Sequence, residues 1–490
     1  MNSVGGVSSK WLVLSAVSVG TFMATLNTSI VNVSLPTIAG DLGVAVTEVE
    51  WIVIAYLLST GVLLLTFGRL GDVLGYRRLY VAGFAVFAVA GTVCGFAGGI
   101  DTLTGLRVVQ GVGAAAVQAV GPAIVSSTFD DSERGKALGI NAISVSVGLA
   151  LGPTLGGLIA EVLSWRWIFF INFPIGFLGL VWIMRVLPRT SNRSDQTFDP
   201  TGAVLAGGML FTLLFALVEG ADLGWSSPTI VALLALSLIL FIAFVVVELR
   251  MEQPMFDLRL FAIRPFAAGS FSLLAAFVAL LSALYLMPFF LQNGQGLTVL
   301  QAGLLITPLS LTTLVVAPFS GVLSDRIGTT ILPTVGLGFI ALGVFSLTTM
   351  DAGTPGLGVV WRMVLIGFGL GVFNSPNQSA IIGSVPRPRL GTASGTIAQM
   401  RITGQVLGVA ASGAILSARI PEHLRELSGS LPEAAARSEA IISSVHEALY
   451  FSAAVALVGT LASLARRGSR RKPPPSDARA EAGITPGAPE

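Results

Sequence analysis

The stretch GINAISVSVGLALGPTLGG, residues 139–157, returns in altered form as GTIAQMRITGQVLGVAASG, residues 395–413. Four glycines keep the same spacing in both copies, at an offset of 256: Gly139, Gly148, Gly152 and Gly157, then Gly395, Gly404, Gly408 and Gly413. Identical spacing of four glycines is not expected by chance, even in a chain with 57 glycines. The chain is therefore predicted to consist of two similar halves.

The composition places both halves in a membrane. Of the 490 residues, 53% are hydrophobic and 11% are charged, and the mean hydropathy is +0.83. A helix needs roughly 20 apolar residues to cross about 30 Å of hydrocarbon. Fourteen spans are predicted, at about residues 11–35, 49–68, 79–99, 102–127, 137–162, 167–187, 201–220, 228–248, 266–292, 301–323, 331–350, 358–383, 391–417 and 446–465. The expected fold class is an all-α integral membrane protein.

The repeat extends beyond the glycines. GRLGDVLG at residues 68–75 is echoed by GVLSDRIG at residues 321–328, and Arg107 by Arg362. Spans 1–6 thus correspond to spans 9–14, while spans 7 and 8 have no counterpart. A parallel repeat about an axis normal to the membrane is typical of transporters that rock two halves around a midplane site.

Basic residues predict the orientation, because cytosolic loops are enriched in Lys and Arg. With the N-terminus inside, only four of the 28 basic residues fall outside, and three lie within spans. Both termini are therefore predicted to be cytosolic. The predicted segments are a cytosolic N-terminus (1–10), a six-helix bundle (11–187), two extra spans with linkers (188–265), a second six-helix bundle (266–465) with an outer loop (418–445), and a disordered cytosolic tail (466–490).

Arg107 lies in LRVVQGVG, residues 106–113, inside an apolar span. A charge at the bilayer centre costs about 2.5–3.5 kcal/mol on insertion scales, so it usually faces a watery cavity or a partner. Gln110, three residues on, shares its helical face. We expect a polar cavity whose lining residues are Asn27, Arg107, Gln110, Arg362, Asn374, Asn377, Gln378 and Arg401.

Two alternatives remain open for this group. The amides of the twelfth span can contact substrate, or they can form hydrogen bonds between helices. Arg401 replaces Val145 of the first half. It can be a second cavity cation or the partner of a carboxylate such as Glu219 or Glu161.

Several motifs together resemble the major facilitator superfamily and, within it, the fourteen-span drug:proton antiporter family. GRLGDVLGYRR at residues 68–78 resembles the loop motif after span 2, and RVVQGVGAA at 107–115 the span 4 motif. The glycine run of residues 139–157 resembles the span 5 antiporter motif. LNTSIVNVSLP at 26–36 and WRWIFFINFPIG at 165–176 resemble runs typical of fourteen-span exporters. The resemblance implies two six-helix bundles and favours export over import.

Two sets of residues are expected to control the conformational change. Glycines four apart let helices approach closely, and a proline bends its helix. The antiporter-helix set is Gly148, Gly152, Pro153, Gly156 and Gly157. An aspartate at a cytosolic helix end can cap a neighbouring helix or pair with arginines, and a latch worth about 1–2 kcal/mol shifts a two-state population roughly 5- to 30-fold. The latch set is Gly68, Asp72, Gly75, Arg77, Arg78, Asp325 and Arg326. Plain helix packing and solvated loop charges are the alternatives.

Asn27 departs from the family pattern, in which many members carry Asp in span 1. An amide cannot carry a proton. The clearly mid-membrane ionisable groups are three arginines, and Glu161, Glu219 and Glu248 lie near span ends. Glu219 is the predicted proton-coupling residue, and the preferred compounds are expected to be neutral or anionic.

Other classes of function are excluded or disfavoured. The single cysteine, Cys94, excludes an intramolecular disulfide, and two histidines cannot form a metal cage by themselves. The sequence has no phosphate-binding Gly-x4-Gly-Lys-Ser/Thr loop, and a net charge of +2 does not indicate a nucleic-acid partner. We expect neither enzyme activity, metal nor cofactor.

The leading prediction is a bacterial inner-membrane exporter of small amphipathic or drug-like compounds. It would alternate access in exchange for protons, as a monomer whose partners are the substrate, protons and the lipid bilayer. One alternative is a weakly coupled exporter or facilitator of an anionic, zwitterionic or lipid-like compound. Another is a membrane receptor that uses the same fold without transport, because fold does not fix function.

Overall fold

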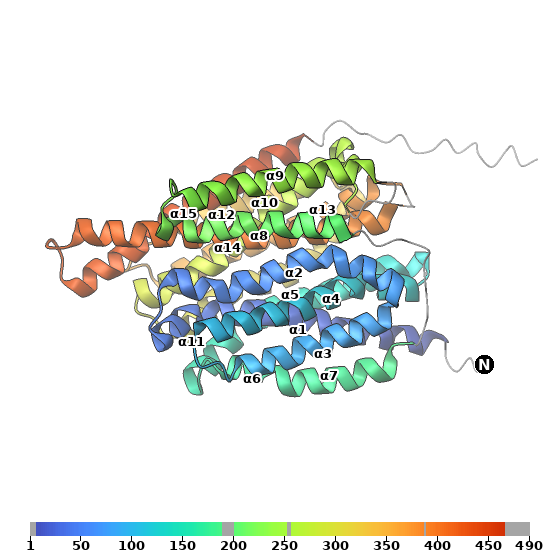
Figure 1. Ribbon diagram of the computed structural model, residues 1–490, viewed down its shortest axis with the longest axis horizontal. Coiled ribbons are helices and arrows are strands. Elements are labelled where there is room, and N and C mark those ends of the chain that lie inside the picture. Colours follow the sequence, from blue (N-terminus) through green and yellow to red (C-terminus); the bar gives the residue numbers. More distant parts are fainter. Residues whose placement is uncertain (1–5, 189–199, 252–255, 387–388, 466–490) are drawn as a thin grey trace, which may run out of the picture.

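The computed structural model describes residues 6–188, 200–251, 256–386 and 389–465 (Figure 1). Within these ranges every regular element is a helix, apart from one bridge pair between Ser428 and Leu431. The elements are α1 (Gly6–Leu42), α2 (Val46–Leu74), α3 (Tyr76–Cys94), α4 (Ile100–Thr128), α5 (Asp131–Val162), α6 (Trp167–Phe170), α7 (Asn172–Val186), α8 (Pro200–Leu223), α9 (Pro228–Arg250), η1 (Leu258–Ala262), α10 (Arg264–Phe289), η2 (Phe290–Gly294), α11 (Val299–Ile327), α12 (Ile331–Leu347), α13 (Gly356–Gly383), α14 (Leu390–Leu427) and α15 (Glu433–Leu464).

Each predicted span coincides with a helix, except that residues 167–187 form the pair α6 and α7. Among the described residues, twelve stretches are long and apolar enough to cross a membrane. The two remaining helices differ from these in length or composition. Helix α12 has only 17 residues, and α14 has 38 residues but carries Gln399, Arg401 and Gln405 in its middle. The fourteen-span count therefore stays a prediction.

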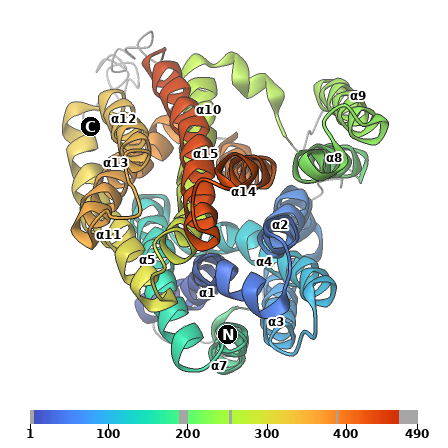
Figure 2. The same ribbon diagram turned by 90° about the vertical axis from the view of Figure 1, so that its left-hand side faces the viewer.

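The packing of the helices repeats as the sequence does. Helix α1 packs on α5, α2 and α3 pack on α4, and α3 packs on α7. In the second half α10 packs on α14, α11 and α12 pack on α13, and α12 packs on α15. Figure 2 shows the resulting two bundles. Helices α8 and α9 pack on each other beside them, where α8 contacts α2 and α14.

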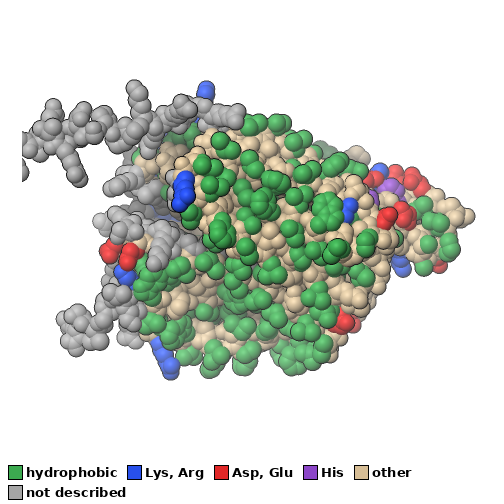
Figure 3. Space-filling view, turned by 180° about the vertical axis from the view of Figure 1, so that it is seen from behind, with side chains coloured by type: hydrophobic (Ala, Val, Ile, Leu, Met, Phe, Trp, Pro, Cys, Tyr) green, Lys and Arg blue, Asp and Glu red, His purple; other side chains and the backbone are tan. Residues whose placement is uncertain are grey.

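The surface has the apolar band that a bilayer requires. In Figure 3 apolar side chains cover the visible face, and charged side chains gather towards the two ends of the molecule. Large apolar residues stay exposed within the band, among them Phe177 at 59% and Phe319 at 73%. Such exposure is unfavourable in water and is expected against lipid.

The predicted outer loop, residues 418–445, is mostly helical. Helix α14 continues to Leu427 and α15 begins at Glu433, so the two helices form a hairpin that projects from one end (Figure 1). Arg419 joins the two helices by donating hydrogen bonds to Glu447. The described chain begins and ends at the opposite end of the molecule from this hairpin (Figure 1). An even number of crossings gives this arrangement.

The orientation can be tested with reporter fusions. Fusions after Arg78 and Arg264 are expected to report the cytosol, and fusions after Gly43 and Ser430 the outside, because the basic residues gather on one side. Reporter activity on each side, normalised to protein level, is the measurement. A cytosolic signal at Ser430 would contradict the fourteen-span arrangement.

Candidate functional site

Arg107 is completely buried inside the N-terminal bundle. Its Nε donates to the backbone oxygen of Ile52 at 2.9 Å, and its Nη1 donates to Asn27 Oδ1 and, at 2.7 Å, to Gln110 Oε1. The guanidinium carbon also lies 4.2 Å from the centre of the Tyr56 ring. A cation over an aromatic face is attracted by the ring quadrupole. The cation of α4 is thus held by α1, by α2 and by its own helix.

The amides around Arg107 are as buried as the cation. Asn27 is 2% exposed and Gln110 is 0% exposed. Three nitrogens of the cluster have no acceptor among the described residues, namely Arg107 Nη2, Asn27 Nδ2 and Gln110 Nε2. Buried donors are normally satisfied by protein or by ordered water. This arrangement suits an oxygen acceptor rather than a cation.

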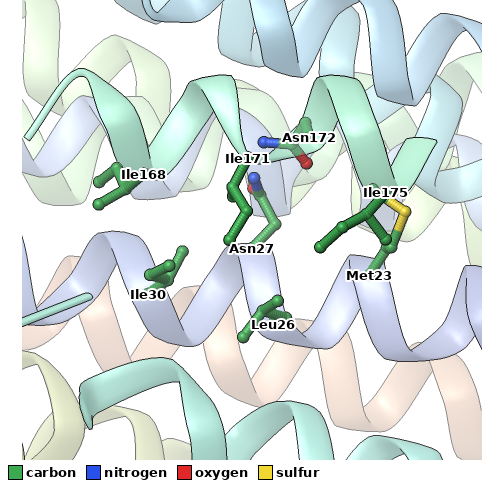
Figure 4. A pocket seen from close by; sticks show the side chains of 8 residues that line it. All are labelled: Met23, Leu26, Asn27, Ile30, Ile168, Ile171, Asn172 and Ile175. Atoms are coloured by element: carbon green, nitrogen blue, oxygen red, sulfur yellow. The ribbon is translucent and has the colours of Figure 1, made fainter. Parts of the chain in front are cut away.

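A small pocket lies beside this cluster, between α1 and the α6–α7 segment (Figure 4). Asn27 and Asn172 are its polar lining residues, and the rest of the lining is apolar. Asn172 donates to the backbone oxygen of Phe169 at 2.9 Å. A Cβ atom at Gly91 would meet both Gln110 and Asn172. The glycine therefore lets the two amides approach each other.

Arg362 lies in a different environment, although the repeat makes it the counterpart of Arg107. Its Nε donates to the backbone oxygen of Ser346 at 2.7 Å, and its Nη2 donates to Thr349 Oγ1 at 2.8 Å. Both partners lie at the C-terminal end of α12, where helix carbonyls lack intrahelical partners. Arg362 therefore caps a helix, and a role in the cavity stays a prediction.

The Arg362→Ala variant is expected to keep most export activity and to lose stability of about 1 kcal/mol, the usual value of a cation at a helix C-terminus. Thermal melting of the purified protein and a transport assay check the two parts. Loss of transport with unchanged melting would instead assign Arg362 to the transport pathway.

The other polar residues of the second half fall into separate environments. Asn377 is fully buried and donates to the backbone oxygen of Gly269 on α10 at 3.3 Å. Gln378 donates to Asn374 Oδ1 at 2.9 Å, and both are partly exposed. Arg401, also partly exposed, makes no ion pair with a carboxylate among the described residues. The structure thus joins Gln378 to Asn374, whereas Asn377 donates to the backbone of α10.

Glycines set the crossing of α5 with α1. A Cβ at Gly148 would lie 2.9 Å from the backbone oxygen of Phe22, and a Cβ at Gly156 would lie 2.8 Å from that of Ile30. Gly152 likewise packs directly on Ser29. In the second half Gly404 and Gly408 pack on backbone oxygens of α10 in the same way. The repeated glycines are therefore positions of close helix contact.

The end of the same motif contacts the other bundle. A Cβ at Gly157 would lie 2.7 Å from the backbone oxygen of Val299 on α11. A Cβ at Gly303 would overlap the backbone oxygen of Pro153. Thr154 and Thr307 share a hydrogen bond of 2.5 Å nearby. Helix α5 thus packs on α1 through one face and on α11 through the other.

Further hydrogen bonds join the bundles at their predicted outer ends. Gln292 donates to the backbone oxygen of Val33 at 2.8 Å and accepts from Thr37 at 3.1 Å. Glu161 accepts from the backbone nitrogen of Leu300 at 3.0 Å. The outer end of the molecule is therefore closed by direct contact between the bundles.

The sequence interpretation overlooked Glu50, a completely buried carboxyl group on α2. Tyr285 of α10 donates to Glu50 Oε2 at 3.1 Å. A Cβ at Gly413 of α14 would overlap Glu50 Oε2. Tyr285 and Gly413 both belong to the C-terminal bundle, whereas Glu50 belongs to the N-terminal bundle. The predicted coupling residue Glu219, on α8, instead accepts from Trp51 at 3.2 Å and is partly exposed.

The predicted latch lies partly outside the described residues, because the Asp72 and Asp325 side chains are not among them. Gly75 and Gly328 have φ values of 92° and 86°, as tight turns between these helices require. Arg77 donates to the backbone oxygens of Leu187 and Met184 at the end of α7. Gly68 has open space around it, and Arg78 and Arg326 are exposed. The latch stays a prediction.

The comparisons with known proteins agree with this architecture. A family model described as Major Facilitator Superfamily matches residues 17–409. The chain belongs to this superfamily. A solved structure of a bacterial homolog to the human lysosomal transporter Spinster, in an inward-facing and unoccupied conformation, superposes with a TM-score of 0.64. It is 17% identical and covers 95% of this chain and 100% of its own, so it shows the shared fold alone.

Curated relatives of this superfamily member are bacterial transporters. The riboflavin transporter RibZ of Clostridioides difficile is 34% identical, over 82% of this chain and 87% of its own. The multidrug resistance protein Stp of Mycobacterium tuberculosis is 34% identical, over 83% of this chain and 76% of its own. With the candidate spans, these findings make the chain a multi-pass inner-membrane transporter and not an enzyme.

Proposed function

We propose that the chain is a secondary active exporter of small amphipathic or drug-like compounds that works in exchange for protons. The observation that carries the proposal is the contact of α5 with α1 and α11 through its glycine motif. Pro153 and Gly157 face the other bundle, while Gly148, Gly152 and Gly156 face α1. A helix that contacts the opposite bundle through glycines can tighten or release that contact with little side-chain rearrangement. The drug-resistance name of Stp supports the same proposal.

The cluster around Arg107 supports a preference for neutral or anionic compounds. Its unpartnered atoms are donors, and Asn27 supplies no negative charge for a lipophilic cation. A compound with carbonyl or acidic oxygen atoms would satisfy these donors if the bundle exposes them during the cycle.

A weakly coupled exporter or facilitator of an anionic or zwitterionic compound is the second candidate. Arg401 favours it, since this partly exposed cation has no carboxylate partner among the described residues. The riboflavin transporter among the relatives is in accord with that chemistry.

Uptake into inverted vesicles tests these proposals. The vesicles come from a strain that lacks its own exporters, and the panel contains riboflavin, ethidium and fluorescent anionic dyes. Proton exchange predicts accumulation that collapses when an uncoupler removes the pH gradient. Uptake that only equilibrates the compound across the membrane, and that continues without any ion gradient, favours the second candidate. A chain that moves no member of the panel, while a known exporter does, contradicts both.

A further inference from the structure

We propose that the pocket beside Arg107 binds a small monovalent anion such as chloride inside the N-terminal bundle. The inference goes beyond the proposed export function and does not depend on it. Three observations carry it: the charge of Arg107, the donors without acceptors that border the pocket, and the size and lining of the pocket.

The positive charge of Arg107 makes no ion pair with a carboxylate among the described residues. Its guanidinium group donates to the backbone oxygen of Ile52 and to the side chains of Asn27 and Gln110, which are all neutral. The ring of Tyr56 attracts the cation through its quadrupole and carries no net charge. A completely buried charge is costly unless an opposite charge lies close to it. An anion beside Arg107 would therefore stabilise the N-terminal bundle.

Donors without acceptors border the pocket. Asn27 lines it, and Asn27 Nδ2 has no acceptor among the described residues. Gln110 Nε2 likewise has none, and it lies beside the second polar lining residue, because a Cβ at Gly91 would be 2.5 Å from Gln110 Nε2 and 3.0 Å from Asn172 Cγ. In Figure 4 the Asn27 side chain points from α1 towards the segment that carries Asn172. An anion in the pocket would thus lie next to amide donors and close to the cation that holds Asn27.

The size and the lining of the pocket select a small ion. The space holds about one water-sized particle, so a drug-like compound does not fit. A halide ion is only slightly larger than a water molecule. Apart from the two asparagines, the lining residues are all apolar and offer no donor side chains for a phosphate or a sulfate: Met23, Leu26, Ile30, Ile168, Ile171 and Ile175. A water molecule would accept from the same donors, but it would not balance the charge of Arg107.

The proposed anion site belongs to the N-terminal bundle alone. Its lining residues come from α1, α6, α7 and the residue between α6 and α7, and no described residue of the C-terminal bundle lines it. A compound that passes between the bundles could reach these donors only if the bundle opens, whereas the pocket already borders them. The anion would join α1 and α4 to the α6–α7 segment. It is therefore a bound partner of the bundle and distinct from the exported compound.

Thermal melting of the purified full-length protein tests the inference without any exported compound. Chloride is replaced stepwise by gluconate, a much larger anion, at constant ionic strength. The melting temperature of the wild type is expected to rise with chloride concentration, since a ligand that binds only the folded state stabilises it. Above the dissociation constant, each tenfold rise in chloride should add about the same increment. Equal melting temperatures in chloride and gluconate would overturn the inference and would favour ordered water as the acceptor.

Asn27→Asp makes the melting result specific. The new carboxylate would lie beside Arg107, supply the opposite charge and repel an anion, so this variant should melt at the same temperature in chloride and in gluconate. The matched control is Asn374→Asp, the same change on α13 of the C-terminal bundle. It should keep the chloride dependence of the wild type. Chloride dependence that persists in Asn27→Asp would place the ion elsewhere and contradict the proposal.

Crystals grown in bromide locate the ion directly, because bromine scatters X-rays anomalously. An anomalous peak is expected beside Asn27 in the wild type and in Asn374→Asp, but not in Asn27→Asp. Anomalous peaks at other places only would refute the site. Melting and diffraction use no exported compound, so they can fail while vesicle uptake succeeds, and the reverse.

Discussion

Arg107→Ala is expected to abolish export and to destabilise the N-terminal bundle by about 2–4 kcal/mol, because buried acceptors lose their donors. Asn27, Gln110 and the backbone oxygen of Ile52 all accept from this one guanidinium group. Arg107→Lys should recover only part of the activity, since an ammonium group lacks the planar fork that reaches several acceptors. Vesicle uptake and thermal melting are the measurements.

The matched control is Arg362→Ala, the same change at the repeat-related position. Arg362 donates to the end of α12 and is partly exposed, so its loss should cost less than the loss of the fully buried Arg107. Equal losses of stability and export in the two variants would show that the buried cluster has no special role. Full export by Arg107→Ala at normal expression would lead to the same conclusion.

The helices and the repeat could be predicted from sequence because their signals are local. Runs of apolar residues mark the spans, and glycines at fixed spacing mark the contact faces of α5 and α14. Positions of close contact between helices need small residues, so the spacing of the glycines also predicts which helix faces pack closely. The length of the outer hairpin was harder to predict, because helices α14 and α15 extend beyond the hydrophobic stretch that defines a span.

The environments of single polar residues could not be predicted from the sequence, because they depend on contacts between residues that are distant in the sequence. Arg107 and Arg362 occupy equivalent positions, yet one lies among buried amides and the other caps a helix. Glu50 looks like an ordinary helix-end carboxyl group until Gly413 and Tyr285 are placed against it. One signal was available, since the repeat aligns Glu50 with Gly303, where a carboxyl group replaces a glycine.

Gly303→Ala is expected to hold the outer end open and to reduce export strongly. The new methyl group would overlap the backbone oxygen of Pro153, and a backbone atom of a packed helix cannot move aside alone. Overpacking of this kind costs about 1–3 kcal/mol in the closed state. A cost of 1–2 kcal/mol borne by one of two states shifts their ratio roughly 5- to 30-fold. Spin labels on cysteines at Val162 of α5 and Leu357 of α13, which are 68% and 79% exposed, should therefore report longer distances than in the unsubstituted protein, both in a Cys94→Ala background.

Gly105→Ala is the control for this prediction, because a methyl group at Gly105 on α4 meets no atom within 4 Å. The substitution is the same and also lies in a helix, where alanine is favoured over glycine by about 1 kcal/mol. Export and the label distances should stay at wild-type values in this variant. If Gly303→Ala also transports normally with short distances, the α5–α11 contact does not limit closure. If Gly303→Ala alone opens the outer end, close packing of glycine against Pro153 is what allows the bundles to meet.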